Sequence, residues 1–513
     1  MKATPPITHV ERLLLRRRRL LGLPAVAAIV LLIALGLATV IAGIVAVRRL
    51  AINDTPIHAD IVAHFAHGSI GSEENSGLPY WIWQALPRLF PERFDGRLDY
   101  KAFGFLYDRQ GELPIGIARR AYRGVDLVWF NCAICHTGTW RATEGDVPSI
   151  VHGMPSNNLD LYRFVRFLLD AAADERLAPE RVLRAMRDAG ARLGIVDRLL
   201  WQYYVIPSVR EGLVQRRSRL LGLLAEQPAW GPGRVDTFNP YKLQQMGMML
   251  GALAPEERIG AADFPSIFHQ KPRDGMQLHW DGNNTSLAER NLSAALGAGV
   301  TPDTVDHGAI RRVADWLGDL QPPPSPHKVA PDAAERGRAL YMAGCASCHG
   351  YRDATGYVFK GATLGKVVPN AELGVDPGRL DSYTAAFRER QLSELFAGTP
   401  YRFARFAKTD GYANLPLDGL WLRGPYLHNG AVPTLRDLLS PQADRPAAFV
   451  RGLDVVDGRN GGFVAPRCDA KTPPPRGFCF DTTRPGNGNG GHRYGTDLAP
   501  GQKDDLLAYL LTF

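Results

Sequence analysis

Two short stretches decide the fold of this chain, Cys132-Ala133-Ile134-Cys135-His136 and Cys345-Ala346-Ser347-Cys348-His349. Each has the pattern C-x-x-C-H, in which two thiols add across the vinyl groups of one porphyrin and the adjacent imidazole binds the iron from the proximal side. The pattern predicts two covalently bound haem c groups, held by Cys132, Cys135 and His136 and by Cys345, Cys348 and His349. A zinc ligand pair or a thioredoxin-like redox pair is the alternative for an isolated C-x-x-C, but neither requires a histidine at the next position.

The composition is that of an ordinary globular protein, apart from a basic N-terminus. The chain has 513 residues, of which 45% are hydrophobic, and this length is enough for two or three domains. Residues 1–50 contain eight Lys or Arg and one acid, so that 52 bases face 51 acids in the remainder. We therefore expect no nucleic-acid partner.

A long uncharged stretch follows the N-terminal bases. Residues 20–47 carry no charge, which is long enough to cross a bilayer with some tilt. Six Lys or Arg precede this stretch and two follow it, so the positive-inside rule puts the N-terminus in the cytoplasm and the rest outside. We predict that residues 1–50 are a cytoplasmic N-terminus and a transmembrane anchor. A cleavable signal peptide is the alternative, although its apolar core would be shorter.

Helical patterns frame both motifs and divide the chain. Helices are predicted over 333–341, before the second motif, and over 503–511, where leucines share one face. The first half ends in a similar helix over 310–320, and the proline-rich residues 321–326 then break it. We predict a first haem domain at 51–325 and a second at 326–513.

The first domain is enlarged by a helical insertion. Apolar residues recur at three- and four-residue spacing over 161–173, 179–189 and 195–224, which predicts amphipathic helices covering the haem core. The predicted fold class is mainly α: tandem cytochrome c-type helical domains, the first with a large helical insertion, preceded by one transmembrane helix.

Two further motifs indicate a family. His279-Trp280-Asp281-Gly282-Asn283 resembles the F-W-D-G-R motif of the bacterial di-haem cytochrome c peroxidases and of the di-haem enzyme that matures methylamine dehydrogenase. Leu422-Arg423-Gly424-Pro425-Tyr426-Leu427-His428-Asn429-Gly430, followed by Pro433-Thr434-Leu435, resembles the P-Y-x-H-[DN]-G…T-L motif of the same superfamily. Together with Pro79-Tyr80-Trp81-Ile82-Trp83, the chain is most similar to the branch that contains the di-haem rubber oxygenases. The resemblance covers nearly everything after residue 75, but His279 replaces the usual Phe and Asn283 the usual Arg.

The resemblance also implies a compartment. In c-type cytochromes haem is attached after export, so we expect a single-pass protein of the bacterial inner membrane with its haem domains in the periplasm. Cys468 and Cys479 are the thiols left over, and we expect them to form a disulfide in that oxidising compartment. Two unpaired thiols are the alternative.

The sixth ligand of the second iron is expected from the loop before the last helix, since the superfamily draws its distal ligand from there. His492 is the candidate, and its glycine-rich surroundings would let the backbone pass close to a porphyrin. His428 is the alternative ligand, although we favour a role for it beside the haem edge.

The sixth position of the first iron has three interpretations. It is open, or His152 occupies it, or Met154 does. Val151-His152-Gly153-Met154-Pro155-Ser156-Asn157 resembles a segment of the rubber-oxygenase branch, whose N-terminal haem keeps this position for dioxygen. An open position permits chemistry, whereas a six-coordinate haem only transfers electrons.

Three more residues are candidates for the site. Trp280 is expected to link the two haems, as the matching Trp does in the family, with core packing as the alternative, and we assign Trp280 and His428 as candidate catalytic residues. Arg423 and Arg234 are candidates to pair with haem propionates, because arginine offers a bidentate fork to carboxylates. An ordinary ion pair is the alternative for each arginine.

Two functions compete. The first is a periplasmic, membrane-anchored di-haem oxidoreductase, peroxidase-like or oxygenase-like, whose N-terminal haem reacts with dioxygen or hydrogen peroxide. The alternative is a non-catalytic electron-transfer cytochrome of a respiratory chain. In both cases the redox partner protein is unknown, and no acidic cluster demands the calcium ion that the peroxidases bind between domains.

Overall fold

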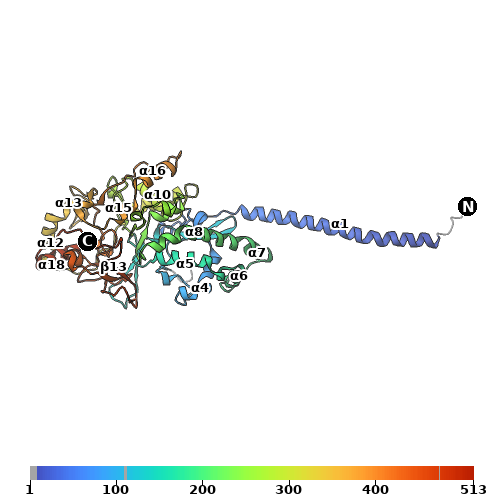
Figure 1. The fold of residues 1–513 in the computed structure, drawn as a ribbon, viewed down its shortest axis with the longest axis horizontal. Coiled ribbons are helices and arrows are strands. Elements are labelled where there is room, and N and C mark those ends of the chain that lie inside the picture. The colour runs from blue at the N-terminus through green and yellow to red at the C-terminus, as the bar shows by residue number, and fades with distance from the viewer. Residues whose placement is uncertain (1–7, 109–112, 473) are drawn as a thin grey trace. The chain divides into compact units, whose positions relative to one another are not determined.

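The computed structural model describes residues 8–108, 113–472 and 474–513 (Figure 1). The chain divides into two units. The N-terminal unit comprises the chain up to Thr55 together with Ala121–Asp126, and the main unit comprises Pro56–Arg120 and Leu127–Phe513.

The N-terminal unit contains one long helix, α1 (His9–Leu50). Within it, Ala25–Val45 is long and apolar enough to cross a membrane, with a mean hydropathy of 2.9. The expected single apolar helix is therefore present. Its length and composition are compatible with an anchor and also with a signal sequence.

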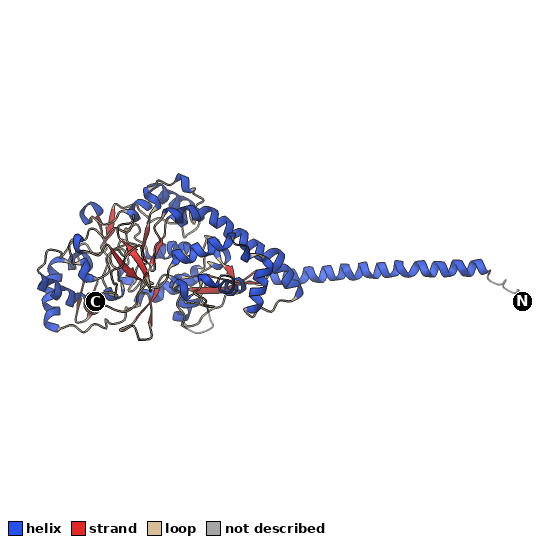
Figure 2. Ribbon diagram, turned by 60° about the horizontal axis from the view of Figure 1, so that its bottom comes forward, coloured by secondary structure: helices blue, strands red, loops and turns tan. Residues whose placement is uncertain are grey.

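The main unit is a mixed α/β structure, so the prediction of a mainly helical fold is wrong. Helices account for 43% of the structure and strands for 13%, in several small sheets (Figure 2). The helices are α2 (Ile61–His67), α3 (Glu73–Ser76), α4 (Tyr80–Leu89), α5 (Leu161–Ala173), α6 (Pro179–Asp188), α7 (Ile195–Leu200), α8 (Ile206–Glu226), α9 (Asn239–Gln244), α10 (Leu287–Gly297), α11 (His307–Asp319), α12 (Pro331–Gly344), α13 (Ala346–His349), α14 (Asn370–Leu373), α15 (Gly378–Ser382), α16 (Ala385–Glu394), α17 (Leu435–Leu438) and α18 (Pro500–Leu510).

The strands are short and pair mostly with near neighbours in the chain. They are β1 (Leu78–Pro79), β2 (Ile117–Tyr122), β3 (Val125–Phe130), β4 (Thr137–Trp140), β5 (Ser149–His152), β6 (Arg234–Asp236), β7 (Ala261–Asp263), β8 (Tyr351–Asp353), β9 (Gly356–Val358), β10 (Val367–Pro369), β11 (Gly411–Ala413), β12 (Ala448–Arg451) and β13 (Phe478–Asp481). One sheet has the order β1-β3-β2, and the others are the antiparallel pairs β4-β5, β6-β7, β8-β9, β10-β11 and β12-β13. A strand of two to six residues is too short to show a clear alternation of apolar and polar residues in the sequence, which is why only helices were expected.

The long amphipathic helices lie close to where their spacing predicts them. Helix α5 spans the expected 161–173, and its N-terminus is capped by Asp160, which accepts a hydrogen bond from the Arg163 amide at 2.9 Å. Helix α11 ends at Asp319, directly before the proline-rich stretch that was expected to stop it. The expected disulfide is also present, joining Cys468 to Cys479 beside the β12-β13 pair.

The first and last helices of the C-terminal half cross at a glycine. Helix α12 packs on α18, and the core beside this crossing includes Tyr341, Leu506 and Tyr509. A Cβ atom on Gly337 would overlap the backbone carbonyl of Asp505, so the two helices can approach this closely only where α12 has no side chain. The crossing holds the segment that ends in Cys345.

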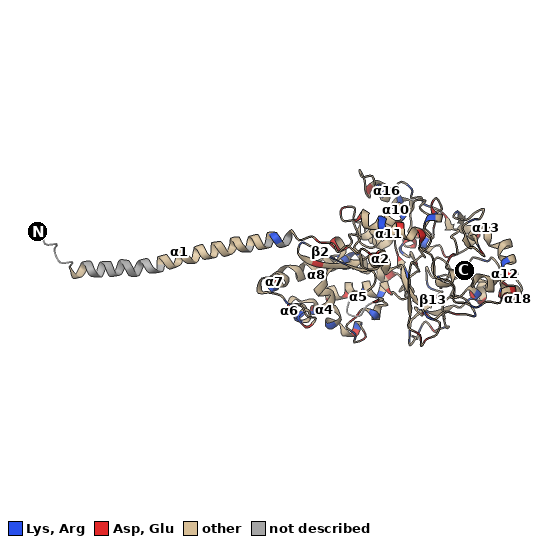
Figure 3. Ribbon diagram, turned by 180° about the vertical axis from the view of Figure 1, so that it is seen from behind, with Lys and Arg blue, Asp and Glu red and all other residues tan. Residues whose placement is uncertain are grey.

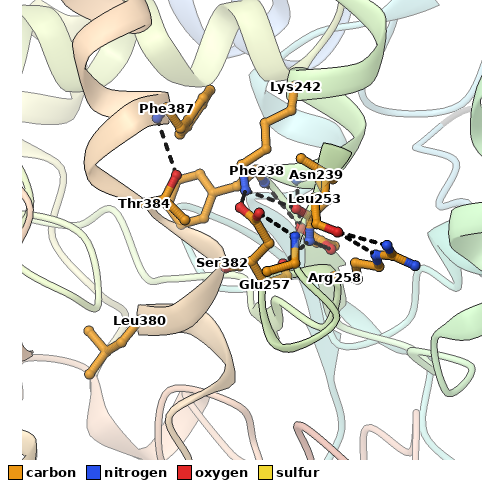
Figure 4. Close-up of polar contacts among 12 residues, drawn as sticks. Phe238, Asn239, Lys242, Leu253, Glu257, Arg258, Leu380, Ser382, Thr384 and Phe387 are labelled. Carbon is orange, nitrogen blue, oxygen red and sulfur yellow. Dashed lines mark hydrogen bonds and ion pairs between the residues drawn. The ribbon is translucent and has the colours of Figure 1, made fainter. Parts of the chain in front are cut away.

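A buried ion pair fixes the middle of the chain. Lys242 of α9 is fully buried, and its Nζ donates to Glu257 Oε2 at 2.8 Å and to Asn239 Oδ1 at 3.2 Å (Figure 4). The ammonium group also lies 5.4 Å from the centre of the Phe387 ring. A buried charge is tolerated only when it is paired and hydrogen-bonded, and Lys242 meets both conditions. We therefore assign this network a structural role.

The helix crossing gives a first prediction. We expect Gly337→Ala to lower the free energy of unfolding by about 1–3 kcal/mol, because the added methyl group must push α12 away from α18. Chemical denaturation followed by circular dichroism measures the change. Gly501→Ala, in α18 with open space around its Cβ position, is the matched control and should not be destabilised. Equal stability of the two variants would contradict this account of the crossing.

Candidate functional site: two motif histidines and the segments behind them

The first motif lies in a short turn held by Asn131. Residues 132–134 form the 3-10 helix η3, and the Asn131 side chain accepts a hydrogen bond from the Ala133 amide at 2.9 Å and donates to Gly68 O at 2.9 Å. Phe65 and Ala133 belong to the same buried apolar cluster, against which Cys132 packs. The four motif cysteines are all free, as thioether attachment requires.

His136 is fixed from behind by a backbone carbonyl. Its Nδ1 lies 3.0 Å from Pro265 O, so Nδ1 carries the proton and Nε2 is left with its lone pair. Burial lowers the pKa of His136 to about 4, and the neighbouring Arg290 acts in the same direction. A neutral imidazole with a fixed ring is the form that binds a metal.

His349 of the second motif has the same arrangement. Its Nδ1 lies 2.8 Å from Leu415 O, and burial lowers its pKa below the ordinary value. Tyr357 donates a hydrogen bond to the His349 carbonyl, and its hydroxyl also accepts one from the Leu417 amide. Both motif histidines therefore present Nε2 as the free ring nitrogen.

A second imidazole faces His349. The ring centres of His349 and His492 are 6.3 Å apart, with an angle of 41° between the ring planes. Two imidazoles that bind one metal from opposite sides, with metal–nitrogen distances of about 2.0–2.1 Å, have ring centres about 6 Å apart. The pair is therefore spaced to accept one iron atom between them.

His492 is held in an unusual backbone conformation. Its φ is 48°, a left-handed value that costs energy for a residue with a side chain, and such residues gather at functional sites. Its amide donates to Leu373 O at 3.1 Å, while its own Nδ1 is buried without a partner. Burial lowers the pKa of His492 to about 4, so this imidazole is also neutral.

Arg445 supports the loop that carries His492, and sequence reasoning missed it. This arginine is 5% exposed, and its Nη1 donates to Asn489 O at 2.6 Å and to Gly491 O at 3.0 Å. The other end of the guanidinium group is anchored on Leu438 O and Ser440 O, at 3.2 Å each. Nothing in the sequence around Arg445 identifies this role, because its acceptors are backbone carbonyls.

The surroundings of the first motif differ from those of the second. Among the described residues, no second imidazole pairs with His136 as His492 does with His349. His152 lies on β5 opposite Thr137, and its Nδ1 is 3.0 Å from the Thr137 hydroxyl. Met154 is fully buried in an apolar cluster with Phe268 and Trp421. Ligation of iron by either residue stays a prediction.

The segment from Asp263 to Pro265 connects three of the predicted site residues. Pro265 O lies behind His136, Asp263 O accepts the indole N–H of Trp280 at 2.8 Å, and the Asp263 amide donates to His428 O at 2.8 Å. Trp280 and Leu373 both pack against the cluster of Val375, Leu380 and Tyr412, and the Leu373 carbonyl accepts a hydrogen bond from the His492 amide. Hydrogen bonds and packing thus lead from His136 through Trp280 to the loop of His492.

The W-D-G-N motif and its two departures are explained by local contacts. Asp281 and Arg379 form a buried ion pair, with Oδ1–Nη2 at 2.9 Å. His279 Nδ1 lies 2.6 Å from Asn283 Oδ1, so the two residues at which this segment differs from the motif that it resembles interact with each other.

The H-N-G motif is packed against the same Asp263. The Asp263 carboxylate binds Arg451 at 2.8 Å and lies 3.8 Å from Arg234. A Cβ atom on Gly430, whose φ is +62°, would overlap both Asp263 and Arg451, so only glycine fits there. His428 stacks on Tyr412 with ring centres 4.2 Å apart, and its Nε2 lies 3.1 Å from the Tyr412 hydroxyl.

The two arginines predicted to bind propionates are engaged by protein acceptors. Arg234, 1% exposed, donates to Asn487 Oδ1 at 2.7 Å and to Ala261 O at 2.9 Å. Arg423 donates to Pro416 O at 2.7 Å and to Asp418 Oδ1 at 2.9 Å. Each retains a buried Nε without a hydrogen-bond partner, and propionate binding stays a prediction for both.

Arg290 of α10 has two buried guanidinium nitrogens without hydrogen-bond partners. Its Nε and Nη2 are buried without partners, and it lies close enough to Cys132 and His136 to influence the pKa of both. Burial lowers its own pKa to about 10. A polar group left in this state is expensive unless a ligand satisfies it. Sequence analysis gave no signal for Arg290.

Part of this site matches a cytochrome c-like family. Residues 411–450 match the family described as RoxA-like, cytochrome c-like, and this stretch includes His428 and Gly430. The match shows a relationship to the cytochromes c and implies covalently bound haem c. Among the described residues, no group of three or more His, Cys, Asp or Glu side chains is placed to hold a further metal ion.

Two proteins of Sinorhizobium fredii (strain NBRC 101917 / NGR234) are similar to the chain. The uncharacterized protein y4iJ is 40% identical over 535 aligned residues, which cover 80% of this chain and 83% of y4iJ. The uncharacterized protein y4iM is 33% identical over 218 residues, or 39% of this chain, and the alignment covers 49% of y4iM, about half its length. The chain belongs to the same family as y4iJ.

The Asp418 cluster gives a second prediction. Asp418 is 1% exposed and pairs with Arg273, Arg423 and His269. We expect Asp418→Asn to lower the free energy of unfolding by about 3–5 kcal/mol at pH 7, because it leaves buried cations without their counter-charge. Denaturant titration of both proteins measures the difference, with Asp303→Asn on the surface as the control.

The difference should depend on pH. Burial raises the pKa of Asp418, but Arg273, Arg423 and His269 together lower it by more, so the net pKa lies below its ordinary value. The stabilisation is therefore fully present above the unfolded-state pKa of about 3.9 and is lost as the pH falls through the folded-state pKa. A difference that stays constant down to pH 2 would show that the charge of Asp418 is not the cause.

Proposed function

We propose that the chain is a membrane-anchored di-haem c-type cytochrome of the bacterial periplasm, and that it acts as an oxidoreductase. One haem is attached at Cys132 and Cys135 with His136 as proximal ligand, and the other at Cys345 and Cys348 with His349 as proximal ligand. The equivalent hydrogen bonds behind His136 and His349 support this assignment, since each leaves Nε2 free for iron. The resemblance to the di-haem peroxidase superfamily and its rubber-oxygenase branch is part of the proposal.

The observation that carries the proposal is the difference between the two motifs. The 6.3 Å between the His349 and His492 ring centres suits a six-coordinate iron, which stores and transfers electrons. His136 has no such partner among the described residues, which supports an open sixth position at the first iron. The first haem is therefore our candidate site for dioxygen or hydrogen peroxide. When bound, the haem supplies the redox chemistry and the oxidant-binding site.

The polypeptide has three tasks in this proposal. His136 and His349 hold the irons, and their carbonyl partners fix the ring orientations. Trp280 provides a route for electrons between the haems, supported by its hydrogen bond to Asp263 and by its packing on the same apolar cluster as Leu373. His428 has a role beside the haem edge rather than as a ligand, because its Nε2 already interacts with Tyr412.

Haem propionates would balance an excess of buried positive charge. Asp418 faces both Arg273 and Arg423, while Asp263 faces both Arg234 and Arg451. Arg290 adds a further cation beside the first motif. Since unmatched buried charge is costly and each porphyrin carries two carboxylates, we assign Arg290 to the first haem and Arg423 to the second.

A third prediction tests the proposal as a whole. We expect two haem c groups per chain by the pyridine haemochrome assay and by mass spectrometry. Cys132→Ala with Cys135→Ala should remove one haem together with the high-spin signal in electron paramagnetic resonance and the binding of carbon monoxide. Cys345→Ala with Cys348→Ala should remove the low-spin signal instead. Attachment of a single haem to the wild-type chain would refute the di-haem assignment.

The same spectra separate an oxidoreductase from a simple electron carrier. Two low-spin haems that bind neither carbon monoxide nor peroxide in any redox state would exclude chemistry at the first haem. The non-catalytic carrier would then be the better description.

A fourth prediction concerns Arg445 as a positioning residue for His492. We expect Arg445→Leu to convert part of the second haem from low-spin to high-spin, because the His492 loop loses the donors that hold Asn489 O and Gly491 O. Arg445→Lys should restore part of the low-spin signal, and His492→Ala should abolish it.

The control is Arg436→Leu, which removes an arginine bound to Asn460 and Asp504. This variant should keep the low-spin spectrum even if it is slightly less stable. An Arg445→Leu protein with unchanged spin state and reduction potential would show that Arg445 does not position His492.

A further inference from the structure

An apolar stripe lies exposed on the helical insertion. Helix α7 continues through the π-helical turn η5 (Trp201–Val205) into α8. Six large apolar or aromatic side chains on α7 and η5 are between 43% and 83% exposed: Ile195, Val196, Leu199, Leu200, Tyr203 and Tyr204. They follow one another at intervals of four residues in two adjacent rows, so they form one continuous face.

This face is not the one that packs on the protein. Trp201, Val205 and Ile206 are buried and supply the inward contacts of the same segment. The apolar residues of this insertion were expected to cover the haem core, whereas these six are exposed to solvent. Exposed apolar residues are common singly, but a continuous exposed face indicates a binding surface.

The charges beside this face are mainly positive. Arg184, Arg187, Arg192 and Arg198 are exposed. Asp188 and Asp197 are the acids between residues 184 and 204. An apolar face with tyrosines and flanking arginines fits the boundary of a bilayer, where aromatic rings lie at headgroup level and arginines contact lipid phosphates.

The chain's own connectivity identifies the partner. The candidate span ends at Val45 and the main unit begins at Pro56, so ten residues join them. Ten residues reach at most about 36 Å when fully extended. If α1 is an anchor, the main unit cannot move far from a bilayer surface. Within the main unit, α6 and α7 lie at the end farthest from α12 and α18 (Figures 1 and 3).

We propose that the face formed by Ile195, Val196, Leu199, Leu200, Tyr203 and Tyr204 inserts into the interface of the membrane that α1 spans. The partner is a phospholipid surface containing anionic headgroups, with the four arginines on the phosphates. This proposal rests on the proposed anchoring and goes beyond it, because a second contact would fix the orientation of the haem unit and not only its distance. The end with α12 and α18 would then face away from the lipid.

The test uses the full chain, with haem attached, in vesicles of phosphatidylethanolamine and phosphatidylglycerol. A spin label is attached to Tyr203→Cys, and in a control protein to Ala354→Cys, which is exposed between β8 and β9. Power-saturation electron paramagnetic resonance compares collisions with oxygen, which enters lipid, and with a water-soluble nickel chelate. The unsubstituted chain, carried through the same labelling, gives the background.

We expect the oxygen-to-nickel accessibility ratio at position 203 to exceed that at position 354 several-fold in chains that float with the vesicles. If the chain floats with the vesicles but the label at position 203 is accessible to the nickel chelate, the interfacial contact is refuted and the membrane anchor is retained. Shielding from both reagents would mean that protein covers the face, and this would also overturn the proposal. A chain that does not float refutes both the anchor and the contact.

Discussion

A backbone carbonyl behind each motif imidazole is the constraint on which the rest of the site depends. Pro265 O and Leu415 O accept the Nδ1 protons of His136 and His349, and each hydrogen bond sets both the tautomer and the direction of Nε2. The surrounding structure keeps these two carbonyls in place. Asp263, two residues before Pro265, binds Arg451, and Asp418, three residues after Leu415, binds Arg273 and Arg423. Disruption of either ion cluster would therefore shift the carbonyl a few residues away and with it the orientation of the imidazole.

The two motif histidines differ in the side chains that lie near them. The glycine-rich loop before α18, supported by Arg445, brings His492 opposite His349, whereas the hairpin after His136 turns His152 toward Thr137 and buries Met154. Both motifs have the same five-residue pattern. In the proposed function, the difference between an electron-storing site and a reactive one would therefore come from what the rest of the chain places opposite each motif imidazole.

Local patterns in the sequence predicted several features well. The spacing of apolar residues predicted helices α5, α11, α12 and α18. The prolines after residue 320 predicted the end of α11, and the two cysteines left over by the motifs predicted the Cys468–Cys479 disulfide. The small sheets were not predicted because strands such as β6 and β7 have only three residues each, which is too few to show a pattern in the sequence. Arg290 and Arg445 escaped because their importance depends on distant neighbours, and any exposed arginine has the same appearance in a sequence.

The sequence alone determined that the chain carries two C-x-x-C-H motifs, because thiols and imidazole within five residues are a local signal. Only the tertiary structure decided which histidine faces His349, which carbonyls orient the imidazoles and that Trp280 bonds to the strand leading to Pro265. It alone decided that the stripe on α7 faces water. The contacts around the histidines join segments that are far apart in the chain, and many of them use backbone atoms, which are the same in every residue. The exposure of the α7 stripe could not be predicted because its segment has apolar residues on two faces, and the sequence does not show which face is buried.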